Sequence, residues 1–254
     1  MISVHPDSHD EDQDAIEVVT PAATYFYHTT GGGFSSLVDV DGNDWLGYQP
    51  GGGPAGEYRG IPNMVFRRGT DYNNHFHPGH GGAKASKTRI VSSDDEQICI
   101  ESAVDSDRWR IRWTIDSDAA RLTVLDTDPA DPGFWFLYEG TPGGRFSMAD
   151  RCLRSDGKDL RMSKQWEGTT ATIDWVAFRV PELNRSLLIQ LETDVVVPVS
   201  YYPMKPMTVF GFGRRLGSAD NLFTSVPLEV SVRLVETADK KELASLASSG
   251  VARG

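Results

Sequence analysis

The clearest pattern in the chain is the alternation of apolar and charged residues over "DRWRIRWTI", residues 107–115. Its four apolar positions, from Trp109 to Ile115, would share one face of a strand, and three arginines would share the other. The segment "ARLTVLDT" (120–127) follows after a short link, so the two segments predict a hairpin. We interpret the arginine face as a solvated strand face whose charges pair with acids on neighbouring strands.

The rest of the pattern also predicts β-structure. Further strands, separated by loops rich in glycine and proline, are expected at 133–140, 171–180, 185–192, 207–214 and 226–235. Residues 34–48 predict a hairpin around Asp41-Gly42, and only residues 238–249 have helical character. Regularly spaced strands with one terminal helix favour an all-β fold, namely a single large β-sandwich with a short C-terminal helix.

The first residues differ in composition from the rest of the chain. The acidic run His9–Asp14 is typical of a solvated, mobile segment, so we expect residues 1–15 to form an acidic flexible tail and residues 16–254 a single β-sandwich domain. The N-terminus lacks the basic and apolar regions of a signal peptide, and no apolar run reaches the length of a transmembrane helix. We therefore expect a cytoplasmic protein, unless a leader has been removed.

The charge balance narrows the choice of partners. The chain has 25 Lys and Arg against 36 Asp and Glu, which gives a formal net charge of −11. Such a surface repels phosphate backbones and acidic membranes, so we expect neither nucleic acid nor a membrane as partner. A homodimer is left open. The two cysteines, Cys99 and Cys152, are too few for a disulfide framework or a zinc knuckle.

Arg59 is the first candidate for chemistry. It follows a glycine-rich stretch and precedes the break Gly60-Ile61-Pro62. A guanidinium group in such a loop can bind a carboxylate or sugar hydroxyls, and the alternative is an arginine that ties its own loop to backbone carbonyls. We count Arg59 among the candidate catalytic residues and its neighbour Tyr58 among the candidate substrate-binding residues.

Three of the six histidines gather in "HFHPGH", residues 75–80. In an extended segment His75 and His77 would point to one face, while the intervening Pro-Gly pair gives His80 an independent direction. Histidine is the natural proton-transfer group near neutral pH, so His77 and His80 are candidate catalytic residues and His75 is a candidate substrate contact. We expect no cofactor, and a divalent metal at His75 and His77, completed by a carboxylate, is the minor alternative.

The segment "FWFLYEG", residues 134–140, forms a third candidate group. On a strand, Trp135 and Glu139 share one face and Tyr138 lies on the other. One face must fill the core, and the other would then offer an aromatic surface beside a polar group, which suits a sugar. Glu139 is a candidate catalytic residue, and Trp135, Tyr138 and Arg145 are candidate substrate-binding residues. The alternative is that both faces are buried between sheets.

Two segments carry a family resemblance. "GFSSLVDVDGNDWL" resembles the opening hairpin of galactose-mutarotase-like supersandwich proteins, and "YRGIPNMVF" is similar to a segment of glucose-6-phosphate 1-epimerases. The resemblance spans roughly residues 25–140. It implies the supersandwich fold and a sugar ligand, with Arg59 binding the substrate and His77 or His80 contacting the sugar ring.

The chain departs from those epimerases in two respects. They carry a second, later histidine that acts as an acid, whereas no histidine follows His80 here. They also carry a glutamate base near the C-terminal end, for which Glu192 and Glu229 are the nearest candidates. Because of these two departures, epimerisation is not our first hypothesis for the function.

Several carbohydrate chemistries therefore compete. We favour β-elimination on a uronic-acid-containing glycan, as in polysaccharide lyases, with Arg59 neutralising the carboxylate and His77 removing a proton. The alternatives are epimerisation of an aldose or hexose phosphate, hydrolysis by paired carboxylates such as Glu139 with Asp150 or Glu167, and a non-catalytic carbohydrate-binding module. A catalytic cleft predicts that Arg59, His77 and Glu139 converge on one point.

Overall fold

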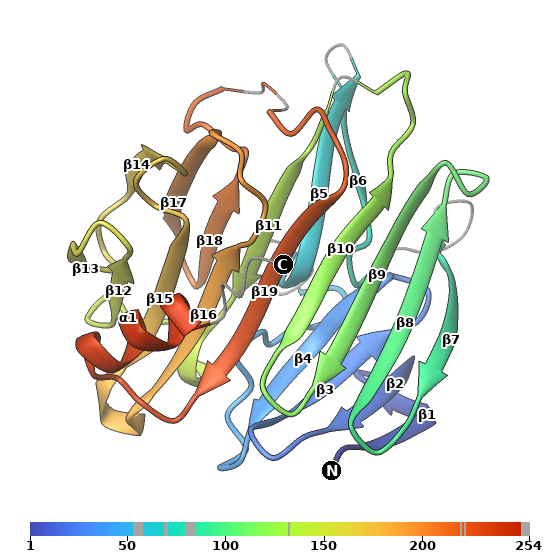
Figure 1. Cartoon of the computed structure of the whole chain (residues 1–254), viewed down its shortest axis with the longest axis horizontal. Coiled ribbons are helices and arrows are strands. Elements are labelled where there is room, and N and C mark those ends of the chain that lie inside the picture. The colour runs from blue at the N-terminus through green and yellow to red at the C-terminus, as the bar shows by residue number, and fades with distance from the viewer. Residues whose placement is uncertain are drawn as a thin grey trace.

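A computed structural model shows two large antiparallel sheets and one C-terminal helix (Figure 1). It describes residues 1–52, 58–68, 71–79, 85–131, 133–218, 220 and 222–249, without the side chains of 66–68 and 71–73. The all-β sandwich predicted from the sequence is confirmed. Within the described residues, no helix has the length and apolar character needed to cross a membrane.

The first sheet has ten strands, nine of them in the order β1-β2-β3-β4-β5-β11-β18-β17-β14, with β6 paired to β5. Their bounds are Ser3–Asp10 (β1), Gln13–Val19 (β2), Ala23–His28 (β3), Gly33–Asp39 (β4), Gly60–Arg68 (β5), Asp71–His75 (β6), Trp135–Gly140 (β11), Trp166–Thr169 (β14), Pro198–Met204 (β17) and Met207–Phe212 (β18). Strand β11 comes from the middle of the sequence and lies between β5 and β18. This order brings three segments far apart in the sequence side by side.

The second sheet has nine strands in the order β13-β12-β15-β16-β19-β10-β9-β8-β7. Their bounds are Lys87–Ser93 (β7), Gln97–Val104 (β8), Trp109–Asp116 (β9), Ala120–Asp126 (β10), Arg151–Arg154 (β12), Asp159–Arg161 (β13), Trp175–Val180 (β15), Arg185–Leu191 (β16) and Leu228–Val235 (β19). Two short 3-10 helices, η3 (Pro142–Gly144) and η4 (Pro181–Leu183), follow β11 and β15.

Strand β9 shows how the sequence pattern builds the core. Trp109 and Trp113 point between the sheets and are fully buried, as their alternation predicts. On the opposite face, Arg110 pairs with Asp126 across to β10, with a nitrogen–oxygen distance of 2.5 Å. Arg112 likewise pairs with a carboxylate of β8. The predicted hairpin of β9 and β10 and the predicted charge pairing are both confirmed.

The helix α1 (Lys240–Ser249) packs on the outer side of the second sheet, across β15 and β16 (Figure 1). Leu243 and Ala247, one turn apart, lie on the same helix face and are buried. They contact Trp175 and Leu188 in a small second core. The helix predicted over residues 238–249 therefore exists and begins two residues later than expected.

The N-terminal segment is a β-hairpin and not the flexible tail expected over residues 1–15. Strands β1 and β2 pair in antiparallel register, with Asp10 opposite Gln13. Most β1 side chains are exposed, so the sequence shows no apolar stripe, although the strand's backbone is paired with β2. The Asp10 carboxylate also accepts hydrogen bonds from the hydroxyls of Ser35 and Ser36 at 2.5 and 2.7 Å, which fastens the hairpin to β4.

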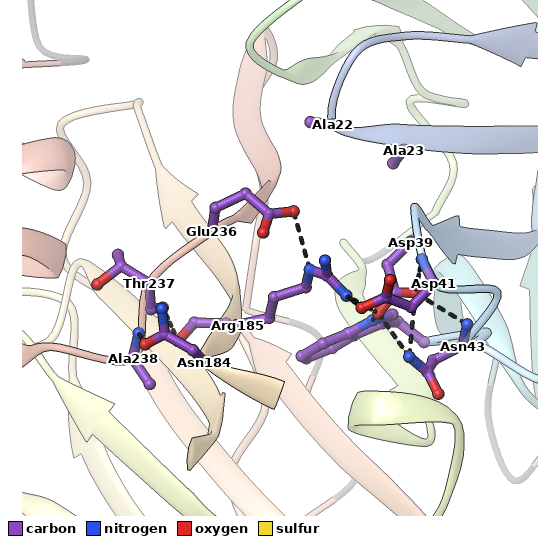
Figure 2. Close-up of polar contacts among 12 residues, drawn as sticks. Ala22, Ala23, Asp39, Asp41, Asn43, Asn184, Arg185, Glu236, Thr237 and Ala238 are labelled. Atoms are coloured by element: carbon purple, nitrogen blue, oxygen red, sulfur yellow. Dashed lines mark hydrogen bonds and ion pairs between the residues drawn. The ribbon is translucent and has the colours of Figure 1, made fainter. Parts of the chain in front are cut away.

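An ion-pair network with a buried centre joins the two sheets (Figure 2). Arg185, at the start of β16, directs Nη1 toward Asp39 at the end of β4, at 3.1 Å. Both side chains are nearly inaccessible to solvent, whereas Asp41 and Glu236, which also pair with this guanidinium group, are exposed. Asp39 additionally accepts a hydrogen bond from Trp45 Nε1 at 3.1 Å. The buried charges are therefore fully partnered, as burial requires.

Candidate active site

Strand β11 separates its two faces as predicted. Tyr138 points into the core, where it is fully buried and its hydroxyl donates a hydrogen bond to the Trp45 carbonyl oxygen at 2.8 Å. Glu139 points to the opposite side of the sheet, next to Asn63 of β5. The substrate contact expected for Tyr138 is not compatible with its position, because its ring and its hydroxyl are both used inside the sandwich.

Glu139 is a buried carboxyl group, and among the described residues its hydrogen-bond donor is the neutral amide of Asn63. Its side chain is 8% exposed, and its Oε2 accepts a hydrogen bond from Asn63 Nδ2 at 2.7 Å. Burial raises the pKa of Glu139 to about 7, although the Asn63 hydrogen bond and the charge of Arg214 oppose that shift. A carboxyl group that titrates near neutral pH can both donate and accept a proton there.

His77 lies beside Glu139 because the chain turns just before it. Phe76 has a φ of 53°, a left-handed value that ends the alternation of β6. His77 Nε2 donates to the carbonyl oxygen of Tyr58 at 2.9 Å and lies 3.9 Å from Glu139 Oε2. Burial lowers the pKa of His77 to about 4, against the backbone carbonyls that favour its protonated form. His77 is therefore neutral near pH 7, and its contact with Glu139 is not an ion pair.

His75 does not share a side with His77, so the expectation of one common face is wrong. His75 is opposite Met64 in the β5–β6 pair and faces the core, where its ring centroid lies 5.0 Å from that of Trp109. The left-handed residue between the two histidines accounts for the difference. In the described part of the chain, no three His, Cys, Asp or Glu side chains gather in a metal-binding group. The geometry thus gives no support to a metal held by His75 and His77.

A cavity of about 600 Å³ opens beside His77. Its described lining includes His77, Asn74, Tyr58, Tyr48, Gln13 and Thr30. Cavities of this size are typical of small-molecule sites. Asn74 Nδ2 donates a long hydrogen bond, 3.4 Å, to Asn63 Oδ1, and Asn63 in turn donates to Glu139. His77 and Asn74 therefore form the wall of the cavity that lies next to Glu139, and Tyr58 is the exposed aromatic at its edge.

Contrary to expectation, Arg59, His77 and Glu139 do not converge on the cavity, because neither Glu139 nor Arg59 is in its described lining. Glu139 lies 3.9 Å from the lining residue His77, whereas Arg59 is held elsewhere. Its Nη1 donates to the carbonyl oxygen of Gly47 at 2.9 Å, and it is absent from the described cavity lining. Gly47 has a φ of 70°, and a Cβ there would lie 3.2 Å from Nη1, so the glycine leaves room for the guanidinium group. The loop-tying alternative for Arg59 is the one that the structure shows.

The remaining candidates lie apart from the cavity. The Trp135 indole is 5% exposed, its Nε1 donates to the carbonyl oxygen of Asp220, and the guanidinium group of Arg214 lies 5.9 Å from its ring centroid. No open face is left on which a sugar can stack. Arg145 is exposed after η3, away from the described cavity lining. His80 lies outside the described residues.

Three polar residues of this region were not identified from the sequence. Asn63 lies inside "YRGIPNMVF". A single amide among apolar strand residues indicates a buried side chain that forms hydrogen bonds, so the sequence carried a signal for this residue. Asn74 adjoins the histidine cluster but carries no motif of its own. Gln13 lines the cavity from the N-terminal hairpin, which the acidic composition had suggested was mobile.

Comparisons with known proteins agree on the fold. No protein-family model matches the chain, and no curated protein matches it. Among solved structures, the protein HI1317 matches with a TM-score of 0.56 and 12% identity over 92% of this chain and 100% of its own. A galactose mutarotase-like protein from Lactobacillus casei matches with a TM-score of 0.53 and 11% identity, over 87% of this chain and 100% of its own.

A larger enzyme contains a similar domain. The α-N-acetylgalactosaminidase NagBb from Bifidobacterium bifidum matches with a TM-score of 0.54 and 16% identity, over 88% of this chain and 36% of its own. The two sheets thus define a β-sandwich of the supersandwich class. More narrowly, the chain has the galactose mutarotase-like fold, as the sequence resemblance implied.

Proposed function

We propose that the protein is a carbohydrate-active enzyme that interconverts the two anomers of a sugar, with Glu139 as the proton-transfer residue. The observation that supports this most is a buried carboxyl group with a pKa of about 7, beside the neutral His77 that lines the cavity. A carboxyl group with a purely structural role is usually held ionised by an ion pair, which keeps its pKa low. A pKa raised to about 7 is more typical of a functional carboxyl group. The fold supports a sugar ligand, since similar structures carry the names of a mutarotase-like protein and a glycosidase.

The proposed reaction moves two protons, one to the ring oxygen and one from the anomeric hydroxyl, and both oxygens are bonded to the anomeric carbon. Protonated Glu139 donates its proton to the ring oxygen, the bond between that oxygen and the anomeric carbon breaks, and the other Glu139 oxygen accepts the proton of the anomeric hydroxyl. The products are the open-chain aldehyde and a reprotonated Glu139. Rotation about the bond next to the aldehyde and the reverse steps give the other anomer. Asn63 holds the carboxyl group in place through its hydrogen bond to Oε2.

β-Elimination on a uronate has weaker support. That reaction needs a cation to neutralise the substrate carboxylate. Arg59 donates to Gly47 instead, and the described lining of the cavity includes no lysine or arginine. Epimerisation of a neutral aldose needs no such cation, because that sugar brings no charge to the site.

The test is anomer exchange measured by two-dimensional proton NMR, with galactose, glucose, N-acetylgalactosamine, glucose 6-phosphate and galacturonate as substrates. We expect an exchange rate proportional to protein concentration for at least one sugar. Glu139→Gln keeps the size of the side chain but cannot lose a proton, so it should reduce the rate by about 10²-fold or more. Glu96→Gln, an exchange at an exposed position, is the matched control and should behave like the wild type.

Two results would contradict the proposal. One is an exchange rate equal to that of buffer for every sugar of the panel. The other is full activity of Glu139→Gln, which would place the chemistry elsewhere. Ultraviolet absorbance with uronic-acid polysaccharides, recorded in parallel, would reveal unsaturated sugar ends if the lyase hypothesis were correct.

A further inference from the structure

The N-terminal hairpin contributes a side chain to the cavity. Gln13 is the first residue of β2, directly after the turn that joins it to β1, and it lines the cavity together with His77 and Asn74. It is half-buried, and its amide nitrogen has no hydrogen-bond partner among the described residues. An amide group at the wall of a cavity with an unused donor is suited to bind a ligand.

His28 fixes which way this amide points. The backbone N–H of Gly31 donates to His28 Nδ1 at 2.8 Å, so Nδ1 is an acceptor and the proton of the neutral ring is on Nε2. Nε2 therefore donates to the amide oxygen of Gln13. Because that oxygen is occupied, the NH₂ group of Gln13 is the end left for a ligand, and it can only donate.

Gly31 connects this arrangement to His77. A Cβ at Gly31 would lie 2.5 Å from the His77 carbonyl oxygen and 2.6 Å from His28 Nδ1, so only glycine fits between them. The backbone of the β3–β4 turn thus packs directly between the two histidines. Gln13 is therefore connected, through His28 and Gly31, to the segment that carries His77, the neighbour of Glu139.

Asn74 offers the opposite polarity on the same cavity. Its NH₂ group donates to Asn63, whose own NH₂ group donates to Glu139. The amide oxygen of Asn74 is therefore left as an acceptor. A ligand that meets the NH₂ group of Gln13 must accept a hydrogen bond, and one that meets the amide oxygen of Asn74 must donate one. A sugar hydroxyl does both, whereas ionised phosphate or carboxylate groups only accept.

We propose that Gln13, oriented by His28, binds a hydroxyl group of a neutral sugar, and that the site selects neutral sugars over phosphorylated sugars and uronates. This proposal rests on the proposed function. It is supported by the fixed donor at Gln13, the fixed acceptor at Asn74 and a described lining in which no side chain is a lysine, arginine, aspartate or glutamate. Gln13 would touch the substrate, and His28 is a positioning residue that acts through it.

The test compares sugar binding and turnover across variants. Dissociation constants are measured by NMR titration with galactose, glucose and N-acetylgalactosamine, and with glucose 6-phosphate and galacturonate. We expect the wild type to bind a neutral sugar at least about 10-fold more tightly than either anionic sugar. Gln13→Leu should weaken that binding and raise KM by about 10-fold, the effect of one lost hydrogen bond, while kcat stays within about 2-fold.

Further variants separate the roles. Gln13→Glu replaces the donor with an acceptor and should weaken binding at least as much as Gln13→Leu. His28→Gln should raise KM with little change in kcat, and Gln165→Leu, at an exposed position outside the cavity, is the matched control. If His28→Gln fails to fold, the Gln13 variants still decide the question.

The outcomes distinguish the two proposals. Wild-type affinity in Gln13→Leu, or tighter binding of an anionic sugar, overturns the role of Gln13 and leaves the role of Glu139 intact. A wild-type protein that neither binds nor converts any sugar overturns both.

Discussion

The titration of Glu139 and His77 should appear in the pH dependence of stability. The pKa of Glu139 is raised by burial from 4.5 to about 7, so the folded protein holds a proton there that the unfolded chain releases. At about 1.4 kcal/mol per pH unit, stability should fall by ~3 kcal/mol as the pH rises from about 4.5 to about 7. Above about pH 7 the folded protein holds an ionised Glu139 carboxylate in its interior, and this loss of stability is complete.

His77 contributes with the opposite sign. Its pKa is lowered by burial from 6.5 to about 4, so in this window the unfolded chain binds a proton that the folded protein does not. Stability should therefore rise by ~3 kcal/mol as the pH rises from about 4 to about 6.5. Between about pH 4.5 and 6.5 the two contributions nearly cancel in the wild type.

Substitution exposes each contribution separately. Glu139→Gln removes the ionisable group, so its stability relative to the wild type should increase by ~3 kcal/mol between pH 4.5 and pH 8.5. The opposing slope of His77 is then no longer cancelled. His77→Gln should reverse the pattern, with its relative stability highest at the acidic end of the range.

Urea unfolding followed by tryptophan fluorescence at four pH values measures these differences. Glu96→Gln, at an exposed position, serves as the control and should differ from the wild type by a constant amount. A constant difference for Glu139→Gln across the same range would contradict this prediction, because it would show that Glu139 titrates alike in the folded and unfolded chains.

Three further predictions concern separate parts of the structure. Asn63→Leu removes the hydrogen-bond donor to Glu139, so the pKa of that carboxyl group should rise further. The pH profile of anomer exchange should then move upward by about one pH unit. An unchanged profile would contradict this prediction. Asp39→Ala leaves the buried guanidinium group of Arg185 without its buried partner and should lower the free energy of unfolding by ~3–5 kcal/mol. Asp41→Ala, at an exposed position, should change the free energy of unfolding by less than ~1 kcal/mol. Equal effects of the two substitutions would contradict the role of burial. Leu243→Ala should lower the free energy of unfolding by about 3 kcal/mol in urea unfolding by loosening the docked helix, and no change would show that the helix packs without this contact.

Strand identity and strand faces could be predicted because they depend on local alternation. The segment around Trp109 has apolar and charged residues in strict turn, and the structure buries one set and pairs the other. The same parity placed Tyr138 and Glu139 on opposite faces of β11. Such inferences need only the period of a strand, which the sequence carries directly.

The arrangement of the candidate site could not be predicted in full, because it depends on contacts that local patterns do not encode. One left-handed residue, Phe76, separates the two neighbouring histidines. The carbonyl oxygen of Gly47, twelve residues earlier, holds Arg59 away from the described cavity lining. Gln13 belongs to a hairpin whose exposed, acidic strand has the composition of a disordered tail, and pairing with its neighbour strand orders it.

The proposed role of Glu139 is tested most directly by titrating its carboxyl carbon by carbon-13 NMR, assigned by comparison with Glu139→Gln, with and without a neutral sugar. We expect a midpoint near pH 7 in the free protein and a chemical-shift change when the sugar binds. A midpoint near 4.5 with no response to any sugar would contradict that role, because Glu139 would then be an ordinary carboxylate outside a binding site.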